Sequence, residues 1–453
     1  MRALKWLLIG VFVLAGLPLA ALVAINAFDE SLTPEAVRYG EPRAPATPDA
    51  ENGYYALLAL GAGDGEDGAA YAKAWVGEGR SAARENRMEL RPEVKRAKRP
   101  AVCDAAQTSC VAAAAARHAE TASELEAYRE DLERYGKLIA APRYEEVLDY
   151  PLRVVTQFPP YRYAVSAHQA YVLRAALAAA SGDFEGAVAA IERDVAFQRV
   201  MLGGARTVLG KAIASANYWR DLAFIADLLQ TRSAGELAPV HARLRDLMKP
   251  IDPVALQVSS AIETEFAFSK QLLRNPGSVQ AGDRGASIWE QLVFRLFYKP
   301  NATINREVAR VSAMAAATSM PVNQGSAELA RILQSESKIE LRDYFDNPAG
   351  NLLRRVAMPE DGTDAYHRLR LHDLDAYNRL VGLRVEMMAA GVVADGAGAY
   401  AAKSDARFHD PYTGKPMAWD AQAKRLGFQA RSKSIVSRKL FSGEKGGIYL
   451  QRD

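Results

Sequence analysis

The chain has 453 residues, of which 49% are hydrophobic and 25% charged, and its formal net charge is +3. This length supports a large buried core in one extended domain or two, and a composition rich in Ala, Leu, Arg and Glu favours helices. A net charge this small on so long a chain gives no reason to expect a nucleic-acid partner.

An uncharged apolar run, Trp6–Phe28, follows Arg2 and Lys5. As a helix it would span roughly 34 Å, which is enough for a bilayer core of about 30 Å. Positive charge precedes the run and acidic residues follow it from Asp29 onward, a distribution that places the N-terminus in the cytoplasm. A cleaved signal peptide, whose apolar region has about 7–15 residues, is the alternative. We therefore expect residues 1–28 to be a single transmembrane anchor in a bacterial inner membrane, with the body in the periplasm.

The next segment, residues 29–52, carries Pro34, Pro42, Pro45 and Pro48 among small and charged residues. Such a composition is typical of extended linkers. We therefore expect a proline-rich tether that connects the anchor to the body.

The two cysteines, Cys103 and Cys110, lie close together in the sequence. Their C-x6-C spacing matches neither a redox C-x-x-C motif nor a zinc knuckle. In an extracytoplasmic compartment such a pair most simply forms a disulfide, which would stabilise the fold by roughly 2.5 kcal/mol. We expect this disulfide.

Helical periodicity dominates the predicted body, residues 53–406. Apolar residues at spacings of three and four predict one long helix over Cys110–Ile139, with His118 on its packed face. Another amphipathic helix is predicted over Gly210–Leu229, and a last long one carries the stripe from Leu374 to Met388. The expected fold is therefore mainly α, an irregular helical bundle or hairpin array.

Residues Ala167–Leu202 predict a helical hairpin around Gly182-Asp183-Phe184, with small residues where the two helices cross. This hairpin resembles one tetratricopeptide helix pair. However, Arg174 and Asp194 stand where that pattern has apolar or small residues, and no second copy occurs at the repeat period. We expect a single hairpin within the bundle, and the resemblance implies no repeat binding groove.

Aromatic residues and prolines alternate between Tyr144 and Tyr171. Two interpretations are open for the aromatic side chains there. They could line a groove for a peptide or a glycan, or they could pack into the core beneath a loop. The candidate groove residues are Tyr150, Phe158, Tyr161 and Tyr163.

Another helix is predicted to begin at Asp252-Pro253, an N-cap followed by proline at the first helical position. Glu265 falls within its apolar stripe. Burial would raise the pKa of that carboxyl towards the range of a general acid. The alternative is an ion pair with an arginine of a neighbouring helix, because no second carboxylate or histidine stands at a helical spacing from it.

The histidines do not form a metal-binding pattern. His367 and His372 are five residues apart, whereas a metal pair on one helix face needs a separation of three or four. A site that also uses His409 and Asp410 is the remaining alternative. We expect no metal and no cofactor.

The C-terminal element, residues 407–453, begins with the turn-forming run Phe408–Pro416, and short strand patterns separated by glycines follow. A small β-hairpin or sheet packed on the last helix is expected. The run Asp410-Pro411-Tyr412-Thr413-Gly414-Lys415-Pro416 is similar to the tail of membrane-anchored helical proteins of proteobacteria, with the pattern D-P-[FY]-[ST]-G-K-P. That resemblance, over the last quarter of the chain, implies the short terminal sheet, and no functional residue is carried over from it.

The chain contains no nucleophile elbow, P-loop, dinucleotide fingerprint or H-E-x-x-H motif. We therefore expect an interaction or scaffold module of the cell envelope that is bound to the inner membrane, with other envelope proteins as its candidate partners. The alternative is an envelope enzyme or binding protein that acts on peptidoglycan or another glycan and uses Glu265 with the aromatic residues.

Overall fold

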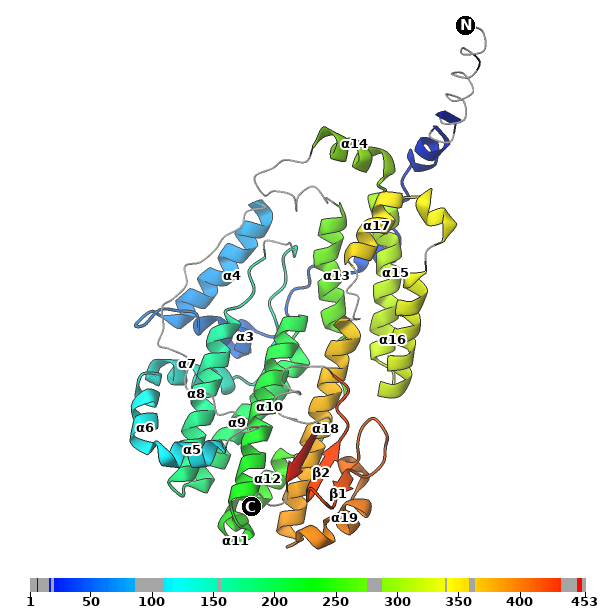
Figure 1. The fold of residues 1–453 in the computed structure, drawn as a ribbon. Helices are drawn as coiled ribbons and strands as arrows, with labels where there is room; N and C mark the ends of the chain where they lie inside the picture. Colours follow the sequence, from blue (N-terminus) through cyan, green and yellow to red (C-terminus); the bar gives the residue numbers. More distant parts are fainter. Residues whose placement is uncertain are drawn as a thin grey trace. The chain divides into compact units, whose positions relative to one another are not determined.

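The computed structural model describes residue 6 and residues 16–17, 20–85, 109–152, 156–274, 287–338, 340–357, 363–432 and 446–449. In this part of the chain helices dominate, and a small antiparallel sheet lies near the C-terminus (Figure 1). The mainly helical fold with a small terminal sheet is therefore confirmed.

The described chain divides into two compact units. The first unit comprises residues 1–42, 151–154 and 262–363, and the second comprises residues 43–150, 155–261 and 364–453. The helices of the first unit are α2 (Pro34–Arg38), α13 (Ser259–Arg274, from Ile262 onward), α14 (Ile288–Phe297), α15 (Pro300–Thr318), α16 (Val322–Ser337), η4 (Leu341–Tyr344) and α17 (Pro348–Ala357).

The second unit is larger and holds the sheet. Its helices up to the end of the α8–α9 hairpin are η1 (Asp49–Glu51), α3 (Gly53–Ala59), α4 (Gly68–Glu85), α5 (Cys110–Ala116), α6 (His118–Glu126), α7 (Arg129–Ile139), α8 (Tyr161–Ala180) and α9 (Phe184–Gly204). The later ones are α10 (Val208–Thr231), α11 (Ala234–Leu237), η2 (Ala238–Val240), α12 (His241–Leu247), α18 (Thr363–Ala389, from Asp364 onward), α19 (Ala394–Ala402) and η5 (Ala406–Phe408).

Helix α10 is the core of the second unit, because side chains on all of its faces are buried. It packs against α5, α8 and α9. Trp219 of α10 stacks on Tyr377 of α18, with ring centroids 4.5 Å apart and planes 19° from parallel. This stack joins the C-terminal helix to the central one, and aromatic pairs of this kind contribute about 0.5–1.5 kcal/mol beyond their buried area.

Helices α8 and α9 form the predicted hairpin. The chain reverses at Gly182, whose φ of +87° places it in the left-handed region that glycine adopts without strain. The amide of Asp183 donates to the carbonyl of Ala178 at 2.9 Å, and that of Gly182 to Ala179 at 3.1 Å. These two bonds are the Schellman arrangement that ends a helix. The carboxylate of Asp183 then accepts from the amide of Gly186 at 2.8 Å and begins α9.

The side chain of Asp183 is the N-cap of α9, and Asp183→Ala removes it. This substitution should lower the free energy of unfolding by about 1 kcal/mol, because an amide at the start of α9 loses its acceptor. Urea unfolding of the purified protein, followed by circular dichroism, measures the change. The exposed neighbour Glu185 is the control, and Glu185→Gln should change the stability by less. Equal effects of the two substitutions would contradict the assigned cap.

One predicted helix is wrong as drawn from the sequence. Residues 110–139 form three helices, α5, α6 and α7, rather than one. The backbone leaves the helical region at Arg117, with φ −122° and ψ 37°, and again at Tyr128, with φ −103° and ψ 10°. The predicted stripe from Leu125 to Ile139 is buried, but the bend at Arg117 turns His118 outward, and its side chain is exposed.

The sheet has the strand order β1-β2-β3 with β1 (Ala418–Asp420), β2 (Arg425–Phe428) and β3 (Gly446–Tyr449), all antiparallel. The turn before it is organised by Asp410, whose carboxylate accepts from the amide of Tyr412 at 2.8 Å and from the hydroxyl of Thr413 at 3.1 Å. The Tyr412 hydroxyl donates to buried Asp373 of α18 at 2.6 Å. The D-P-Y-T-G-K-P run thus fixes the turn onto the last long helix.

Two predictions fall largely outside the described residues. Residues 1–5, 7–15 and 18–19 of the predicted anchor are not among them, and none of the helices in the described ranges is both long and apolar enough to cross a membrane. Cys103 is also outside them, whereas Cys110 is buried at the start of α5. The anchor and the disulfide stay predictions.

Candidate functional site

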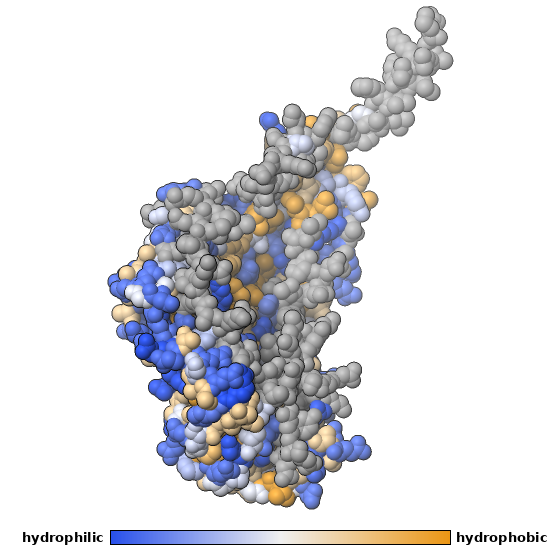
Figure 2. Space-filling model, turned by 60° about the vertical axis from the view of Figure 1, so that its left-hand side comes forward, coloured by the Kyte–Doolittle hydropathy of each residue, from blue (hydrophilic) through white to orange (hydrophobic). Residues whose placement is uncertain are grey.

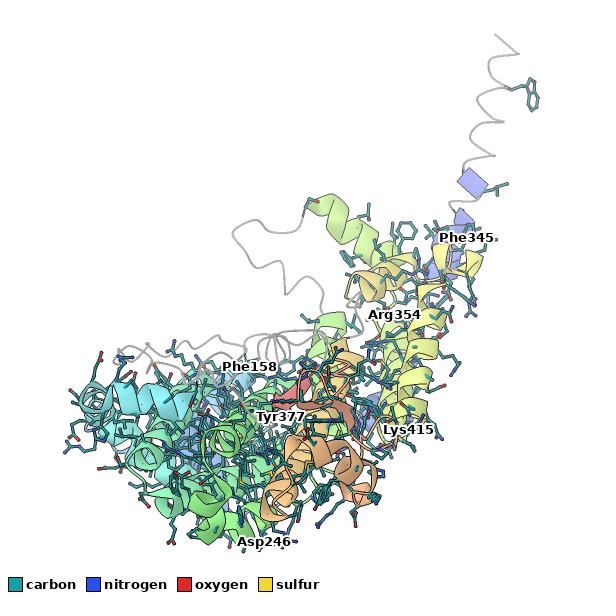
Figure 3. All side chains as sticks on the ribbon, turned by 60° about the horizontal axis from the view of Figure 1, so that its bottom comes forward. Phe158, Asp246, Phe345, Arg354, Tyr377 and Lys415 are labelled. Carbon is teal, nitrogen blue, oxygen red and sulfur yellow. The ribbon has the colours of Figure 1, made fainter. Side chains whose placement is uncertain are left out.

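The residues of the predicted groove lie in the second unit. Tyr150, Tyr161 and Tyr163 are buried, whereas Phe158, which is labelled in Figure 3, is exposed. Burial raises the pKa of Tyr150 to about 12. The Tyr161 hydroxyl donates to the carboxylate of Glu146 at 2.6 Å. Three of the four aromatic side chains are therefore part of the packed interior.

Glu265 lies on α13 in the first unit, whereas the aromatic residues lie in the second. Its side chain is half-buried, and its backbone carbonyl accepts from the Ser269 hydroxyl at 3.1 Å. The structure therefore does not bring Glu265 and the predicted groove residues together in one unit.

The first unit fixes the end of the N-terminal helical segment, residues 20–26, through one buried asparagine. The Asn26 side-chain amide donates to the carbonyl of Phe345 at 2.7 Å, and its oxygen accepts from the amide of Asn347 at 2.8 Å. Asn26 is only 7% exposed. We call this pair of bonds the Asn26 joint, and Phe345 lies at the base of the N-terminal segment in Figure 3.

The residues that follow continue the attachment. The Asp29 carboxylate accepts from the amides of Asn301 and Ala302 at 2.8 and 3.0 Å and so caps the start of α15. An acidic side chain is favourable there because the helix N-terminus carries unpaired amides and partial positive charge. Lys270 of α13 donates to the carbonyls of Val37 and Tyr39 at 3.0 and 3.2 Å. Residues 29–42 of the predicted tether thus make specific contacts within the first unit.

Exposed apolar side chains lie on the loop that forms this joint and on the two helices that flank it. Figure 2 shows hydrophobic surface in the part of the first unit next to the N-terminal segment. Leu341 is 76% exposed and Leu352 is 62% exposed, which are large values for leucine. We define the apolar patch as Leu341, Tyr344, Phe345 and Leu352 of η4, α17 and the loop between them.

A basic cleft of about 420 Å³ also lies in the first unit, between α15, α16, η4 and α17. Seven basic side chains line it: Arg306, Arg310, Arg331, Lys338, Arg342, Arg354 and Arg355. The carboxylate partners of the six arginines are Glu307, Glu328, Glu336, Glu340, Asp343 and Asp346. The charges therefore nearly balance, and the cleft is mainly an ion-pair network that joins the four elements.

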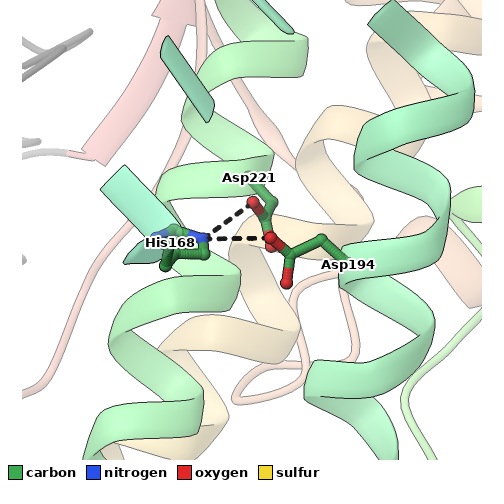
Figure 4. A group of neighbouring side chains, drawn as sticks. All are labelled: His168, Asp194 and Asp221. Carbon is green, nitrogen blue, oxygen red and sulfur yellow. Dashed lines mark hydrogen bonds and ion pairs between the residues drawn. The ribbon is translucent and has the colours of Figure 1, made fainter. Parts of the chain in front are cut away.

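The second unit contains a buried polar cluster at its centre (Figure 4). His168 of α8, Asp194 of α9 and Asp221 of α10 are each fully buried. The Nε2 atom of His168 lies 3.0 Å from Asp221 Oδ1 and 3.6 Å from Asp194 Oδ2. We call these three residues the His–Asp cluster. It brings one imidazole and two carboxylates together away from water.

Neighbouring side chains orient one carboxylate of the cluster. The Tyr135 hydroxyl and the Gln198 amide donate to Asp194 Oδ1 at 2.9 and 2.8 Å. Within the described part of the chain, Asp194 Oδ2, Asp221 Oδ2, His168 Nδ1 and Gln198 Oε1 are buried without a hydrogen-bond partner. Native proteins leave few buried polar atoms in this condition, so the cluster requires an explanation.

Burial controls the protonation of the cluster. It raises the pKa of Asp194 to about 7, with the neighbouring charge of Asp221 as the second cause. Burial also raises the pKa of Asp221 well above its usual range, and it lowers the pKa of His168 to about 4. Each of these groups is therefore driven towards its neutral form in the absence of a compensating charge.

The His–Asp cluster was not predicted from the sequence. Asp194 stood out because it interrupts the small-residue pattern of the hairpin, but its partners come from two other helices. The available signal was a carboxylate on each of two strongly apolar helices, α9 and α10. No family model, curated protein or solved structure matches this chain.

Proposed function

We propose that this protein is a single-pass membrane protein of the bacterial cell envelope, and that its first unit rests on the periplasmic surface of the inner membrane. In this role the helical body is a scaffold held in a defined orientation to the bilayer. The observation that carries the proposal is the Asn26 joint, because it fixes the end of the predicted anchor to the η4–α17 segment, which bears the apolar patch.

The Asn26 joint and the apolar patch act together in this role. A flexible tether would let the body rotate freely, whereas the two hydrogen bonds of one buried amide restrict the angle between the helix and the loop that joins η4 to α17. Exposed apolar side chains next to a membrane-spanning helix lose their contact with water when they enter the headgroup region. Lys338, which is exposed at the end of α16, can then reach anionic headgroups while its stem covers apolar surface.

Photocrosslinking tests this arrangement directly. The full-length protein, with p-benzoylphenylalanine in place of Leu341, is reconstituted in nanodiscs that contain anionic phospholipid. We expect lipid to be crosslinked at this position. The control carries the same group at Met320 of the first unit, which is 41% exposed and follows the end of α15 that is far from the joint, and we expect several-fold less lipid there. Equal yields at the two positions, or none at Leu341, would refute membrane contact by the apolar patch.

The joint itself can be tested in the same assay. Asn26→Ala in the protein that carries the crosslinker at Leu341 should lower the lipid yield several-fold. The reason is that the η4–α17 segment is then no longer fixed to the N-terminal helical segment. Asn323→Ala, which changes an exposed asparagine of α16, should leave the yield unchanged. A yield that is unaffected by Asn26→Ala would show that the joint does not set the orientation.

The topology and the scaffold role need separate measurements. Protease added to spheroplasts should digest the body, and protection of the body would contradict a periplasmic location. Crosslinking in intact cells followed by purification should recover a stable envelope partner with the wild-type protein. If none is recovered from either growing or stationary cells, the scaffold role is refuted while the membrane contact can still stand.

A further inference from the structure

We propose that His168, Asp194 and Asp221 form a binding site for one divalent first-row transition-metal ion at the centre of the second unit. This inference is independent of the membrane role, because it concerns different residues in a different unit. It rests on the geometry of the donor atoms and on the buried oxygens that lack partners.

The donor atoms have the separations of a coordination shell. Two ligands about 2.1 Å from a metal ion lie about 3.0 Å apart at a right angle and about 3.4 Å apart at the tetrahedral angle. In the cluster, His168 Nε2 lies 3.0 Å from Asp221 Oδ1 and 3.6 Å from Asp194 Oδ2. One ligand atom from each of the three residues can be chosen so that all lie within 4.8 Å of one another. Small side-chain shifts would therefore bring all three onto one ion.

The surrounding hydrogen bonds favour this use of Asp194. Tyr135 and Gln198 both donate to Oδ1, which leaves Oδ2 directed towards the imidazole without a partner. Hydrogen bonds from outside the shell orient metal ligands in this way in known metal sites. The side-chain oxygen of Gln198, one helical turn beyond Asp194, is a further unpartnered oxygen that could complete the shell.

A divalent ion would also balance the charge of its ligands. The two carboxylates would release their protons to bind it and, with a neutral imidazole, would then carry two negative charges in an interior with no exposed atom of the three residues. Buried charges are stable when they are paired or coordinate a metal, and a divalent ion would neutralise both carboxylates. Arg220 is a half-buried cationic side chain whose charge lowers the pKa of both His168 and Asp221, and it donates to Ala216 and Asn217 of its own helix.

The donor set indicates the class of ion. One imidazole nitrogen with carboxylate oxygens suits Zn²⁺, Mn²⁺ or Fe²⁺, whereas a site for Cu⁺ would use sulfur ligands. Because the site is fully enclosed, the ion would enter before α8, α9 and α10 close, so binding would be coupled to folding.

The experiment measures metal uptake during refolding. Full-length protein with a streptavidin-binding tag, rather than polyhistidine, is unfolded in guanidinium with EDTA and refolded in detergent with Zn²⁺, Mn²⁺ or anaerobic Fe²⁺. After gel filtration, elemental analysis should find one equivalent of at least one of these ions per chain. Less than a tenth of an equivalent of every ion in the wild type would overturn the proposal.

Matched variants locate the ion. Asp194→Asn and Asp221→Asn should each lower the affinity at least tenfold. Asp227→Asn, a second buried aspartate of α10 that accepts from Ser109 and Val111 instead, should keep the wild-type stoichiometry. Equal binding by the wild type and both cluster variants would overturn the assignment.

X-ray absorption of the metal-loaded wild type makes the test independent of whether the variants fold. The spectrum should show an imidazole ligand and a shell of light donor atoms near 2.1 Å. A shell without imidazole, or with sulfur, would overturn the site even if metal is retained.

Discussion

Gly204→Ala should lower the free energy of unfolding by about 3 kcal/mol or more, which is at the high end for a single substitution. Gly204 ends α9, where the helix passes directly over the backbone of Tyr144. A Cβ atom at this position would lie 1.6 Å from the Tyr144 carbonyl oxygen and 2.6 Å from its carbonyl carbon. These are backbone atoms and no rotamer change relieves the overlap, so the helix or the segment before α8 must move. Urea unfolding measures the loss.

The adjacent glycine is a matched control for this prediction. A Cβ at Gly203 meets no atom within 4 Å. Gly203→Ala should therefore be neutral or stabilise the protein by up to about 1 kcal/mol, because alanine is the better helix former. If the two variants unfold at the same urea concentration, the close approach of Gly204 to Tyr144 does not exist in solution.

The second large effect is a pH dependence that comes from Lys211 of α10. This lysine is only 4% exposed, and its ammonium donates to the carbonyl of Leu202 at 2.7 Å. Burial lowers its pKa from 10.5 to about 8, and the charge of Glu146 opposes that shift in part. Between pH 8 and pH 10.5 the unfolded chain therefore binds a proton at Lys211 that the folded chain does not bind.

This difference in proton binding determines the direction in which stability changes with pH. Stability rises with pH wherever the unfolded state binds more protons, so the wild type should gain stability from pH 8 to pH 10.5 relative to Lys211→Met. The expected gain is about 3 kcal/mol, since one pKa unit corresponds to about 1.36 kcal/mol. Below pH 8 the difference between the two proteins should be constant. Urea unfolding at a series of pH values measures it.

A surface lysine separates this effect from general alkaline changes. Lys249→Met removes an exposed ammonium and should leave the pH profile parallel to that of the wild type. A wild-type profile that stays parallel to Lys211→Met from pH 8 to pH 10.5 would contradict the burial of a charged Lys211.

The sequence predicted those elements whose causes are local. The Gly182-Asp183 turn of the hairpin and the Asp410 turn before the sheet depend on residues that are neighbours in the chain, and the short terminal strands follow from their glycines. The single helix predicted over residues 110–139 is the exception. Its apolar spacing continues through Arg117 and Tyr128, so the pattern contained no sign of the two bends that separate α5, α6 and α7.

The His–Asp cluster could not be predicted for a different reason. Its three residues come from consecutive helices, and only the packing of α8, α9 and α10 places them within hydrogen-bonding distance. Periodicity states which face of a helix is buried but not which residues meet across the interface. Similarly, the prolines of residues 29–52 indicated an extended segment, but the binding of Asp29 to the start of α15 depends on a partner far away in the sequence.

The order of the two units along the chain has a consequence for biosynthesis. The first unit is largely built from residues 262–363, which lie between two parts of the second unit. Helix α18, which stacks against Trp219, therefore leaves the ribosome only after the whole inserted segment. Domains usually fold one after another during synthesis, starting at the N-terminus. Here the larger unit cannot complete its folding until α18 has been synthesised, and α10 is incompletely covered until then. Its nascent form would therefore depend on a chaperone or on a late, cooperative folding step.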